Sequence, residues 1–213
     1  MKSIISLIAI SCVIVICSSF KQSNADGWIS LFDGKSLNGW KVGENANTFS
    51  IENGSIAVNG NVAHLFYDGD IQQHSFKNFE FKADVMTLPG SNSGIYFHTV
   101  YQESSWPQKG YEVQVNNSHT DWRRTGSLYS IQDVKEVYVK DNEWFTEKIK
   151  VQGKRVIISL NDKVVVDYTE PDNVQREAGS AGRVISKGTF ALQGHDPKSK
   201  VYFKNIMVKV LPE

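Results

Sequence analysis

Cysteine is scarce in this chain of 213 residues, and its two cysteines, Cys12 and Cys17, both lie within the first 25 residues. A domain formed by the rest of the chain therefore contains no disulfide bond and must be stabilised by burial of a hydrophobic core. An excess of charge is missing too, because 23 basic residues balance 23 acidic ones. With no basic stripe in the sequence, neither nucleic acid nor an anionic membrane surface is expected as a partner.

Long amphipathic patterns are also lacking after residue 26, apart from a short turn predicted near 172–178. Short segments of alternating apolar and polar residues occur instead, bounded by turn residues such as Asn53-Gly54 and Asn59-Gly60. Alternation with a period of two is typical of strands, and Asn-Gly pairs favour tight hairpins. Roughly a dozen such segments without intervening helices predict an all-β fold, an antiparallel sandwich forming a single domain over residues 26–213.

Residues 1–25 have the pattern of a secretory signal peptide. A charged start precedes an apolar run over residues 4–16, and the small residues Ser23 and Ala25 predict cleavage after Ala25. The alternative is a lipoprotein signal with Cys17 as the lipidated residue, although Ile16 before it is bulkier than such signals usually have. Both readings predict an exported protein, periplasmic or secreted, which contacts the membrane only if Cys17 carries a lipid.

The strand predicted over residues 110–117 carries tyrosine and valine on one face and Glu112 and Gln114 on the other. Along a strand these two polar side chains stand about 7 Å apart. A carboxylate beside an amide on a rigid sheet suits a polar ligand site, whereas a solvated strand face is the simpler alternative. Two further predicted strands carry His98, Gln193 and, where the second extends far enough, His195. If the three strands are neighbours, these residues and Glu112 share one concave face.

Six segments carry motifs that occur in a fixed order: LFDGKSLNGW at 31–40, NSGIYF at 92–97, GYEVQV at 110–115, TGSLY at 125–129, GTFALQGH at 188–195 and VYFKNI at 201–206. They resemble the motifs LFNGKDLSGW, NSG, GYEVQI, TGALY, G-x-I-x-LQ-x-H and V-x-FRNI of the DUF1080 family, also called the 3-keto-disaccharide hydrolase domain. The resemblance spans essentially all of residues 28–210. It implies a concanavalin A-like jelly roll of the lectin/glucanase type, export, and action on 3-keto-glycosides.

The chain departs from this family pattern at three positions. Members usually have arginine where His98 and Lys204 stand, and asparagine is common where Phe145 follows Trp144. If those arginines orient a substrate oxygen through two hydrogen bonds, neither histidine nor lysine reproduces that fork. The departures favour a second hypothesis, in which the chain is a non-catalytic carbohydrate-binding module of the same fold.

Double displacement by two strand-borne carboxylates is not expected here. One jelly-roll glycosidase family uses a strand reading Glu-x-Asp-x-x-Glu, and in that register this chain has Glu112, Gln114 and Asn117. Amides serve neither as nucleophile nor as proton donor, so this route requires an acid from another strand. A 3-keto sugar offers elimination instead, because the C3 ketone makes the proton on C2 acidic and a single base can start the reaction.

Elimination and hydration require a base, an acid and groups that bind the enolate oxygen. Glu112 and His195 are the predicted catalytic residues. A divalent metal that polarises the ketone could serve the same end, with Glu112, His195 and Asp196 as ligands, although no spacing of ligands in the sequence indicates a metal site. The expected partner is an oxidised glycoside. The residues predicted to bind it are Gln114, Gln193, His98, Tyr129, Asn92 and Lys204.

Overall fold

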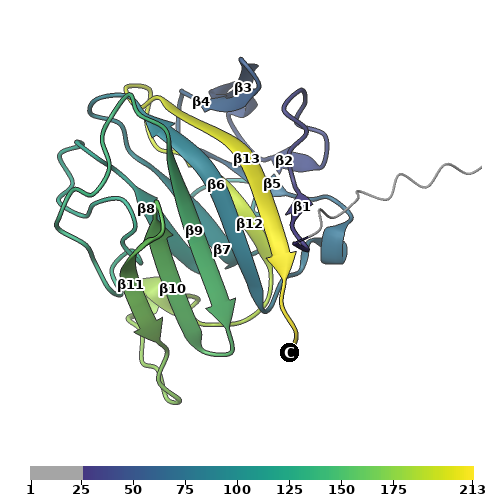
Figure 1. The fold of residues 1–213 in the computed structure, drawn as a ribbon, viewed down its shortest axis with the longest axis vertical. Helices are drawn as coiled ribbons and strands as arrows, with labels where there is room; N and C mark the ends of the chain where they lie inside the picture. The colour runs from purple at the N-terminus through teal and green to yellow at the C-terminus, as the bar shows by residue number, and fades with distance from the viewer. Residues whose placement is uncertain (1–25) are drawn as a thin grey trace, which may run out of the picture.

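The computed structural model describes residues 26–213, so the predicted signal peptide over residues 1–25 lies outside the described part of the chain. Within residues 26–213 two antiparallel sheets of eight and five strands pack face to face, with no α-helix (Figure 1). This arrangement confirms the predicted all-β antiparallel sandwich. No helix in the described range is long and apolar enough to cross a membrane.

The larger sheet contains the central hairpins of the chain and its last strand. β1 pairs with β13 beside the main path of this sheet. The other strands lie in the order β11-β10-β9-β6-β13-β4-β3. Their bounds are β1 Ile29–Ser30, β3 Phe49–Glu52, β4 Ser55–Val58, β6 Phe79–Thr87, β9 Phe145–Gln152, β10 Arg155–Leu160, β11 Lys163–Thr169 and β13 Val201–Val210.

The smaller sheet contains the three strands on which the polar residues were predicted to meet. Its order is β2-β5-β12-β7-β8, so β12, β7 and β8 are indeed neighbours. The strand bounds are β2 Trp40–Val42, β5 Ala63–Tyr67, β7 Ser93–Thr99, β8 Tyr111–Val115 and β12 Thr189–Gly194. Three short 3₁₀ turns complete the described elements, η1 Ala46–Thr48, η2 Ile71–His74 and η3 Ala178–Ser180.

The core lies between the two sheets and is built from the apolar member of each alternating pair. β6 shows this most plainly, because its odd-numbered residues from Phe79 to Thr87 are buried while the residues between them are partly exposed. Phe190 of β12 packs against Phe76, Phe79 and Phe81 with ring centroids 4.7, 4.9 and 4.6 Å apart. Clustered aromatic rings of this kind bury a large apolar area and stabilise the sandwich without a disulfide.

The outer face of the smaller sheet is covered by loops, although its side chains are largely polar. All residues of β7, β8 and β12 are buried. The segment after β8 runs back along the edge of that strand, where Tyr129 N donates to Glu112 O and Gly126 N to Gln114 O. The segment before β8 lies over β5, with Tyr101 packed edge-on against Phe66. A polar strand face enclosed in this way has the features of a binding site.

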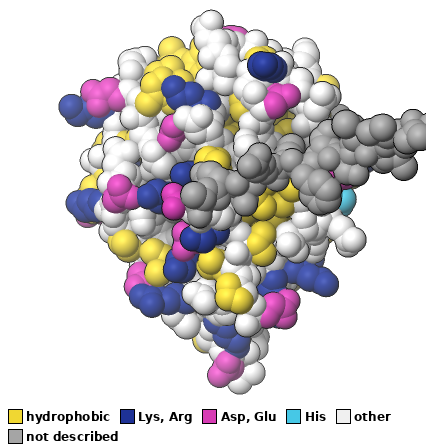
Figure 2. All heavy atoms as spheres, turned by 45° about the vertical axis from the view of Figure 1, so that its right-hand side comes forward, with side chains coloured by type: hydrophobic (Ala, Val, Ile, Leu, Met, Phe, Trp, Pro, Cys, Tyr) yellow, Lys and Arg dark blue, Asp and Glu magenta, His cyan; other side chains and the backbone are white. Residues whose placement is uncertain are grey.

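Charged side chains of both signs are intermixed over the face of the molecule drawn in Figure 2. This distribution agrees with the balanced composition of the sequence, which has 23 basic and 23 acidic residues.

Candidate functional site

Glu112 lies on the edge strand β8, on the outer face of the smaller sheet, and is held by residues of the next two strands, β7 and β12. Tyr96 of β7 stands opposite Glu112 in the register, and its hydroxyl donates to Glu112 Oε2 at 2.8 Å. Gln193 of β12 donates through Nε2 to Glu112 Oε1 at 2.7 Å and to Tyr96 Oη at 3.2 Å. These contacts fix the orientation of the carboxylate, which is only 7% exposed.

Burial raises the pKa of Glu112 above the usual value for a glutamate. Desolvation penalises the charged form, whereas the hydrogen bonds from Tyr96 and Gln193 and the nearby positive charge of Arg183 partly offset it. A carboxylate with a raised pKa accepts a proton more readily near neutral pH than an exposed one does. Glu112 is therefore suited to act as a general base.

Gly94 provides the space that the Glu112 side chain occupies. A Cβ atom at this position would lie 2.5 Å from Glu112 Oε1, closer than any non-bonded contact permits. Gly94 follows Asn92 and Ser93 in β7 and faces Gln114 across the strand pair. The glycine of this Asn-Ser-Gly segment is thus explained by the close approach of a carboxylate and not by an unusual backbone angle.

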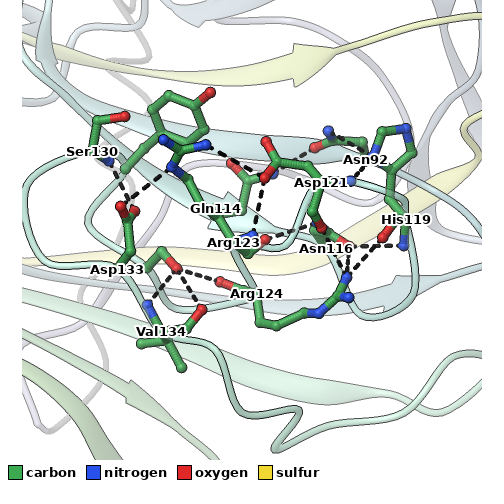
Figure 3. A network of polar contacts seen from close by, with 12 residues as sticks. Asn92, Gln114, Asn116, His119, Asp121, Arg123, Arg124, Ser130, Asp133 and Val134 are labelled. Carbon is green, nitrogen blue, oxygen red and sulfur yellow. Dashed lines mark hydrogen bonds and ion pairs between the residues drawn. The ribbon is translucent and has the colours of Figure 1, made fainter.

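A second polar network lies beside Glu112 (Figure 3). Gln114 Nε2 donates to Asn92 Oδ1 at 2.6 Å, and Asn92 Nδ2 approaches His119 Nδ1 at 3.4 Å. Gln114 Oε1 is buried without a hydrogen-bond partner among the described residues, and so is Gln193 Oε1. Buried acceptors normally have partners, so these two oxygens are available to donors of a ligand such as sugar hydroxyls.

Asn116 shapes the loop that follows β8 and thereby places His119 and Asp121. Its Nδ2 donates to the carbonyl oxygens of Asp121 and Arg123 at 2.9 and 2.8 Å, and its Oδ1 accepts from His119 N at 2.8 Å (Figure 3). Arg124 Nη1 donates to the same Asn116 Oδ1 at 3.0 Å. Because Asn116 is fully buried, these bonds are shielded from water and hold the loop against the sheet.

A cavity of about 240 Å³ lies over Glu112 and Gln114. Its floor is formed by strand residues, Tyr96, Glu112, Gln114 and Gln193. Its walls come from the connecting segments and comprise Asn92, Trp106, Pro107, Asp121, Tyr129, Arg183 and His195. Since ligand pockets typically measure roughly 300–1,000 Å³, the cavity suits one sugar ring better than a longer oligosaccharide.

Trp106 forms one wall of the cavity, with 40% of its surface exposed. Its ring centroid lies 5.5 Å from that of His64 and 5.6 Å from that of His195. Burial lowers the pKa of His64 to about 3, so this histidine is neutral at physiological pH. An exposed indole on such a wall offers an apolar face on which the C–H groups of a sugar can stack.

His119, His195 and Asp196 form the cluster among the described residues that could hold a metal ion, with one ligand atom of each within 4.8 Å of the others. These candidate ligands differ from the ones expected from the sequence, because His119 stands in the place of Glu112. The carboxylate of Glu112 is bound instead by Tyr96 and Gln193. Two imidazoles and a carboxylate suit a divalent cation. His195 Nδ1 lies 2.8 Å from Asp196 Oδ2, and this contact with others outweighs burial and lowers the pKa of Asp196 to about 2.

Six of the predicted site residues line this one cavity: Glu112, His195, Gln114, Gln193, Tyr129 and Asn92. The strand pattern predicted the four that lie on or next to β8 and β12, namely Glu112, Gln114, Gln193 and His195. Tyr129 and Asn92 came from the family motifs. Their positions agree with a shared face, and their roles stay predictions.

His98 does not lie on this face, so its predicted position is wrong. Its backbone φ of 56° lies in the left-handed region and interrupts the alternation of β7 at its end. The ring turns toward the core, 5.6 Å from that of Phe79, where Nε2 contacts Lys77 O at 2.9 Å and Nδ1 accepts from Ser186 N at 3.2 Å. Both ring nitrogens are occupied and burial lowers the pKa of His98 to about 4, as fits a neutral structural histidine.

Lys204 is also absent from the cavity, contrary to the prediction. It lies on β13 in the larger sheet, opposite Asp84 of β6. Its Nζ sits 3.8 Å from the ring centroid of Trp144, so the pair forms a cation–π contact on the other sheet of the sandwich.

Three polar residues in or beside the cavity were not expected from the sequence: Asp121 and Arg183, which line it, and His119, whose ring lies 5.6 Å from that of His195. A signal for His119 and Asp121 was present, because they lie in the polar segment directly after the Glu112 strand. Arg183 lies in an irregular segment between β11 and β12, where no periodicity indicates which way a side chain points. Only the folded chain brings it to the cavity.

Comparison with known proteins agrees with this geometry. A model of the family described as the 3-keto-alpha-glucoside-1,2-lyase-like domain matches residues 27–209. A 3-keto-disaccharide hydrolase from Bacteroides thetaiotaomicron is 31% identical to this chain over an alignment covering 88% of this chain and 80% of the relative.

Solved structures support the fold. A protein from Parabacteroides distasonis ATCC 8503, described as a glycosyl hydrolase, superimposes with a TM-score of 0.74 at 24% identity, covering 89% of this chain and 96% of its own. The carbohydrate-binding module CBM66 from Bacillus subtilis superimposes with a TM-score of 0.57 at 17% identity, covering 80% of this chain and 95% of the module. These neighbours confirm the jelly-roll fold that the family resemblance implied, and the curated relative indicates a carbohydrate-active function.

Proposed function

Because this chain belongs to the family of 3-keto-alpha-glucoside-1,2-lyase-like domains, we propose that it cleaves 3-keto-glycosides by elimination. The observation that carries the proposal is the buried carboxylate of Glu112, held by Tyr96 and Gln193 on the floor of a cavity. The site has a single strand-borne carboxylate, which matches chemistry that begins with one base and not with a carboxylate pair on the strand.

The proposed reaction starts with removal of the proton on C2, which the neighbouring C3 ketone makes acidic. The electron pair of the C2–H bond forms a C2=C3 double bond, and the ketone oxygen becomes an enolate oxygen. Collapse of the enolate restores the ketone, forms a C1=C2 double bond and expels the C1 substituent, which takes up a proton. The products are a 2-hydroxy-3-keto-glycal and an alcohol, and no oxidant or reductant is consumed.

Glu112 is the proposed base. Its raised pKa supports proton abstraction near neutral pH, and its two hydrogen bonds keep the carboxylate in one orientation. His195, on the wall of the same cavity, is the proposed acid that protonates the leaving oxygen. Asp196 orients the imidazole by accepting from Nδ1 when that nitrogen carries the proton.

Addition of water across the C1=C2 bond of the glycal gives the free 3-keto sugar, so that elimination and hydration together amount to hydrolysis. Glu112 returns its proton to C2 in this second step, and His195 takes one from the attacking water. Gln114 Oε1 and Gln193 Oε1, the buried acceptors without partners among the described residues, are proposed to bind hydroxyl groups of the ring.

In an alternative arrangement, His119, His195 and Asp196 would hold a divalent metal that polarises oxygens of the substrate, and His195 would then be a ligand and not the acid. Export from the cytoplasm is part of the proposal, on the strength of the signal-like pattern in residues 1–25. The competing function is carbohydrate binding without turnover, and the similarity in fold to CBM66 favours it.

The decisive experiment incubates the purified domain with methyl 3-keto-α-glucoside and methyl 3-keto-β-glucoside, each with a chelator and with an added divalent ion. We expect methanol release from at least one anomer, accompanied by the ultraviolet absorption of an enone. Binding of these glycosides without any product, in every condition, would establish the binding-module function and exclude the proposed enzyme.

A further inference from the structure

An alternating stack of aromatic rings and guanidinium groups runs from the surface of the molecule into the cavity. Arg123 Cζ lies 4.9 Å from the ring centroid of Trp122 and 4.8 Å from that of Tyr129. Arg183 Cζ lies 5.2 Å from the Tyr129 centroid, and Arg183 Nη1 donates to Tyr129 O at 3.2 Å. Guanidinium groups stack well on aromatic faces, so the four residues support one another.

The two arginines of this stack differ in how their charge is balanced. Arg123 forms ion pairs with Asp133 at 3.2 Å and with Asp121 at 3.5 Å (Figure 3). Arg183 has no carboxylate within ion-pair distance among the described residues, although it lines the cavity. The N–H groups of a guanidinium that is not bound by a carboxylate can donate to an anionic ligand.

The backbone at Arg183 is held as firmly as its side chain. Arg176 Nε donates to Arg183 O at 2.8 Å, and Gly110 N donates to Gly182 O at 2.9 Å. At Gly182 a Cβ atom would lie 2.0 Å from Gln108 O, so only glycine allows the two segments to approach this closely. Since little ordering remains to be done when a ligand binds, Arg183 is preorganised for an anion.

The charged and titratable groups facing this part of the cavity are few. Glu112 lies on the floor, His195 and Asp121 lie on the walls, and Arg123 stands behind Tyr129. Asp121 is paired with Arg123, and Glu112 is hydrogen-bonded to Tyr96 and Gln193. Arg183 and Glu112 interact only at longer range, since neither forms an ion pair among the described residues, and the side chain of Arg183 is not bound by a carboxylate.

We propose that Arg183 is the oxyanion-binding residue of this site and that the ligand class it selects is the planar enolate of a 3-keto sugar. The proposal rests on the elimination reaction proposed above. When Glu112 removes the proton from C2, negative charge moves to the oxygen on C3, and the free N–H groups of Arg183 donate to that oxygen. Trp122, Arg123 and Tyr129 act through Arg183 and are positioning residues.

Kojic acid is a suitable probe for this proposal. It is a planar pyranone with an enol beside a ketone and a hydroxymethyl group on the ring, arranged as in a 2-hydroxy-3-keto-glycal. Its enolate and neutral forms absorb at different wavelengths, so one titration reports both affinity and ionisation state. Its enol methyl ether keeps the ring, the ketone and the hydroxymethyl group, carries one additional methyl group and cannot ionise, and it is the ligand control.

The parent is expected to bind kojic acid more tightly than the methyl ether and to favour its enolate form. Arg183→Gln should lower the affinity for kojic acid by about 10- to 100-fold, the range of a charge-assisted hydrogen bond, and leave the affinity for the ether within a few-fold. Arg183→Lys keeps the charge but not the two parallel N–H donors of arginine. Its affinity for kojic acid should lie between those of the parent and Arg183→Gln. Each titration is run with and without a chelator. The parent and the variants are then compared in the condition in which the parent binds kojic acid more tightly.

The stack has its own test in a pair of tryptophan variants. Trp122→Ala should shift bound kojic acid toward its neutral form, because Arg183 is held less firmly. Trp144→Ala removes a similarly exposed indole, 39% against 46%, that stacks on Lys204 of the other sheet, and should leave the spectrum unchanged. An equal effect of both variants would remove Trp122 from its positioning role.

Two results would overturn the assignment of Arg183: equal affinity of the parent for kojic acid and its ether, or equal loss of both ligands in Arg183→Gln. Failure of the proposed reaction is recognised separately. A parent that discriminates between kojic acid and its ether through Arg183 but turns over no 3-keto-glucoside has the oxyanion site without the enzyme activity.

Discussion

Replacement of Glu112 by glutamine tests the proposed base while leaving the shape of the site almost unchanged. Gln193 donates to Glu112 Oε1 and Tyr96 donates to Glu112 Oε2. A glutamine at 112 keeps its oxygen toward Tyr96 and turns its amide nitrogen toward Gln193. Rotation of the Gln193 amide then presents Gln193 Oε1, which has no partner among the described residues, as the acceptor. Both contacts persist, so we expect a change in stability of less than about 1 kcal/mol.

The effect on turnover should be much larger, because an amide cannot take up the C2 proton. General acid–base groups typically contribute about 10²–10⁴-fold to a rate, so kcat should fall by on the order of a hundredfold or more. KM should change little, since the rotated Gln193 amide presents its nitrogen where Oε1 stood and a sugar hydroxyl can accept a hydrogen bond as well as donate one. In the parent, kcat/KM should rise with pH through the raised pKa of Glu112, because the base must be ionised, and Glu112→Gln should lack this rise.

The assay follows methanol release from a methyl 3-keto-glucoside across a pH series, because hydration in the same site would consume the enone, and melting temperatures are measured on the same samples. Glu52→Gln is the matched control, because Glu52 is a hydrogen-bonded carboxylate contacting Lys200 and Tyr202 outside the cavity. Turnover of Glu112→Gln within a few-fold of the parent would refute the assignment of the base and leave His195 as the main candidate.

Three further outcomes are expected. Gly94→Ala should cut kcat/KM for a 3-keto-glucoside by about tenfold or more, because the added Cβ meets Glu112 Oε1 at 2.5 Å; unchanged kinetics would mean that the carboxylate position is not critical. Lys204→Ala should leave turnover within about twofold of the parent, and a larger loss would argue against its placement on the other sheet. Burial raises the pKa of Glu147, whose carboxyl oxygens have no partner among the described residues. This group costs stability as pH rises above the ordinary glutamate range, so Glu147→Met should stabilise the protein by an amount growing about 1.4 kcal/mol per pH unit; equal pH dependence of unfolding in parent and variant would contradict this.

Much of the fold was predictable, because each strand alternates apolar and polar residues along its length. The pairing of Glu112 with Gln114 on one face followed from that period alone, and the adjacency of β7, β8 and β12 was the condition left open. The structure satisfies this condition.

The residues that the sequence did not place correctly lie where the alternation of apolar and polar residues breaks, or on segments that have no such alternation. His98 was misplaced because one left-handed residue at the end of β7 turns its ring into the core. Arg183 and His119 lie on irregular segments, whose side-chain directions are set by long-range contacts such as those of Asn116 and Arg176. Local patterning carries no information about such contacts.

The division of the site between strands and loops has a consequence for how relatives of this protein can diversify. Glu112, Tyr96 and Gln193 belong to three adjacent strands whose other face packs in the core, so the positions of their backbones cannot shift without disturbing the fold. Trp106 and Asp121 lie on connecting segments, which generally tolerate insertions and exchanges better than strands do. Proton transfer can thus be inherited unchanged while anomer and aglycone preference drift, and libraries aimed at new glycosides are best confined to the connecting segments.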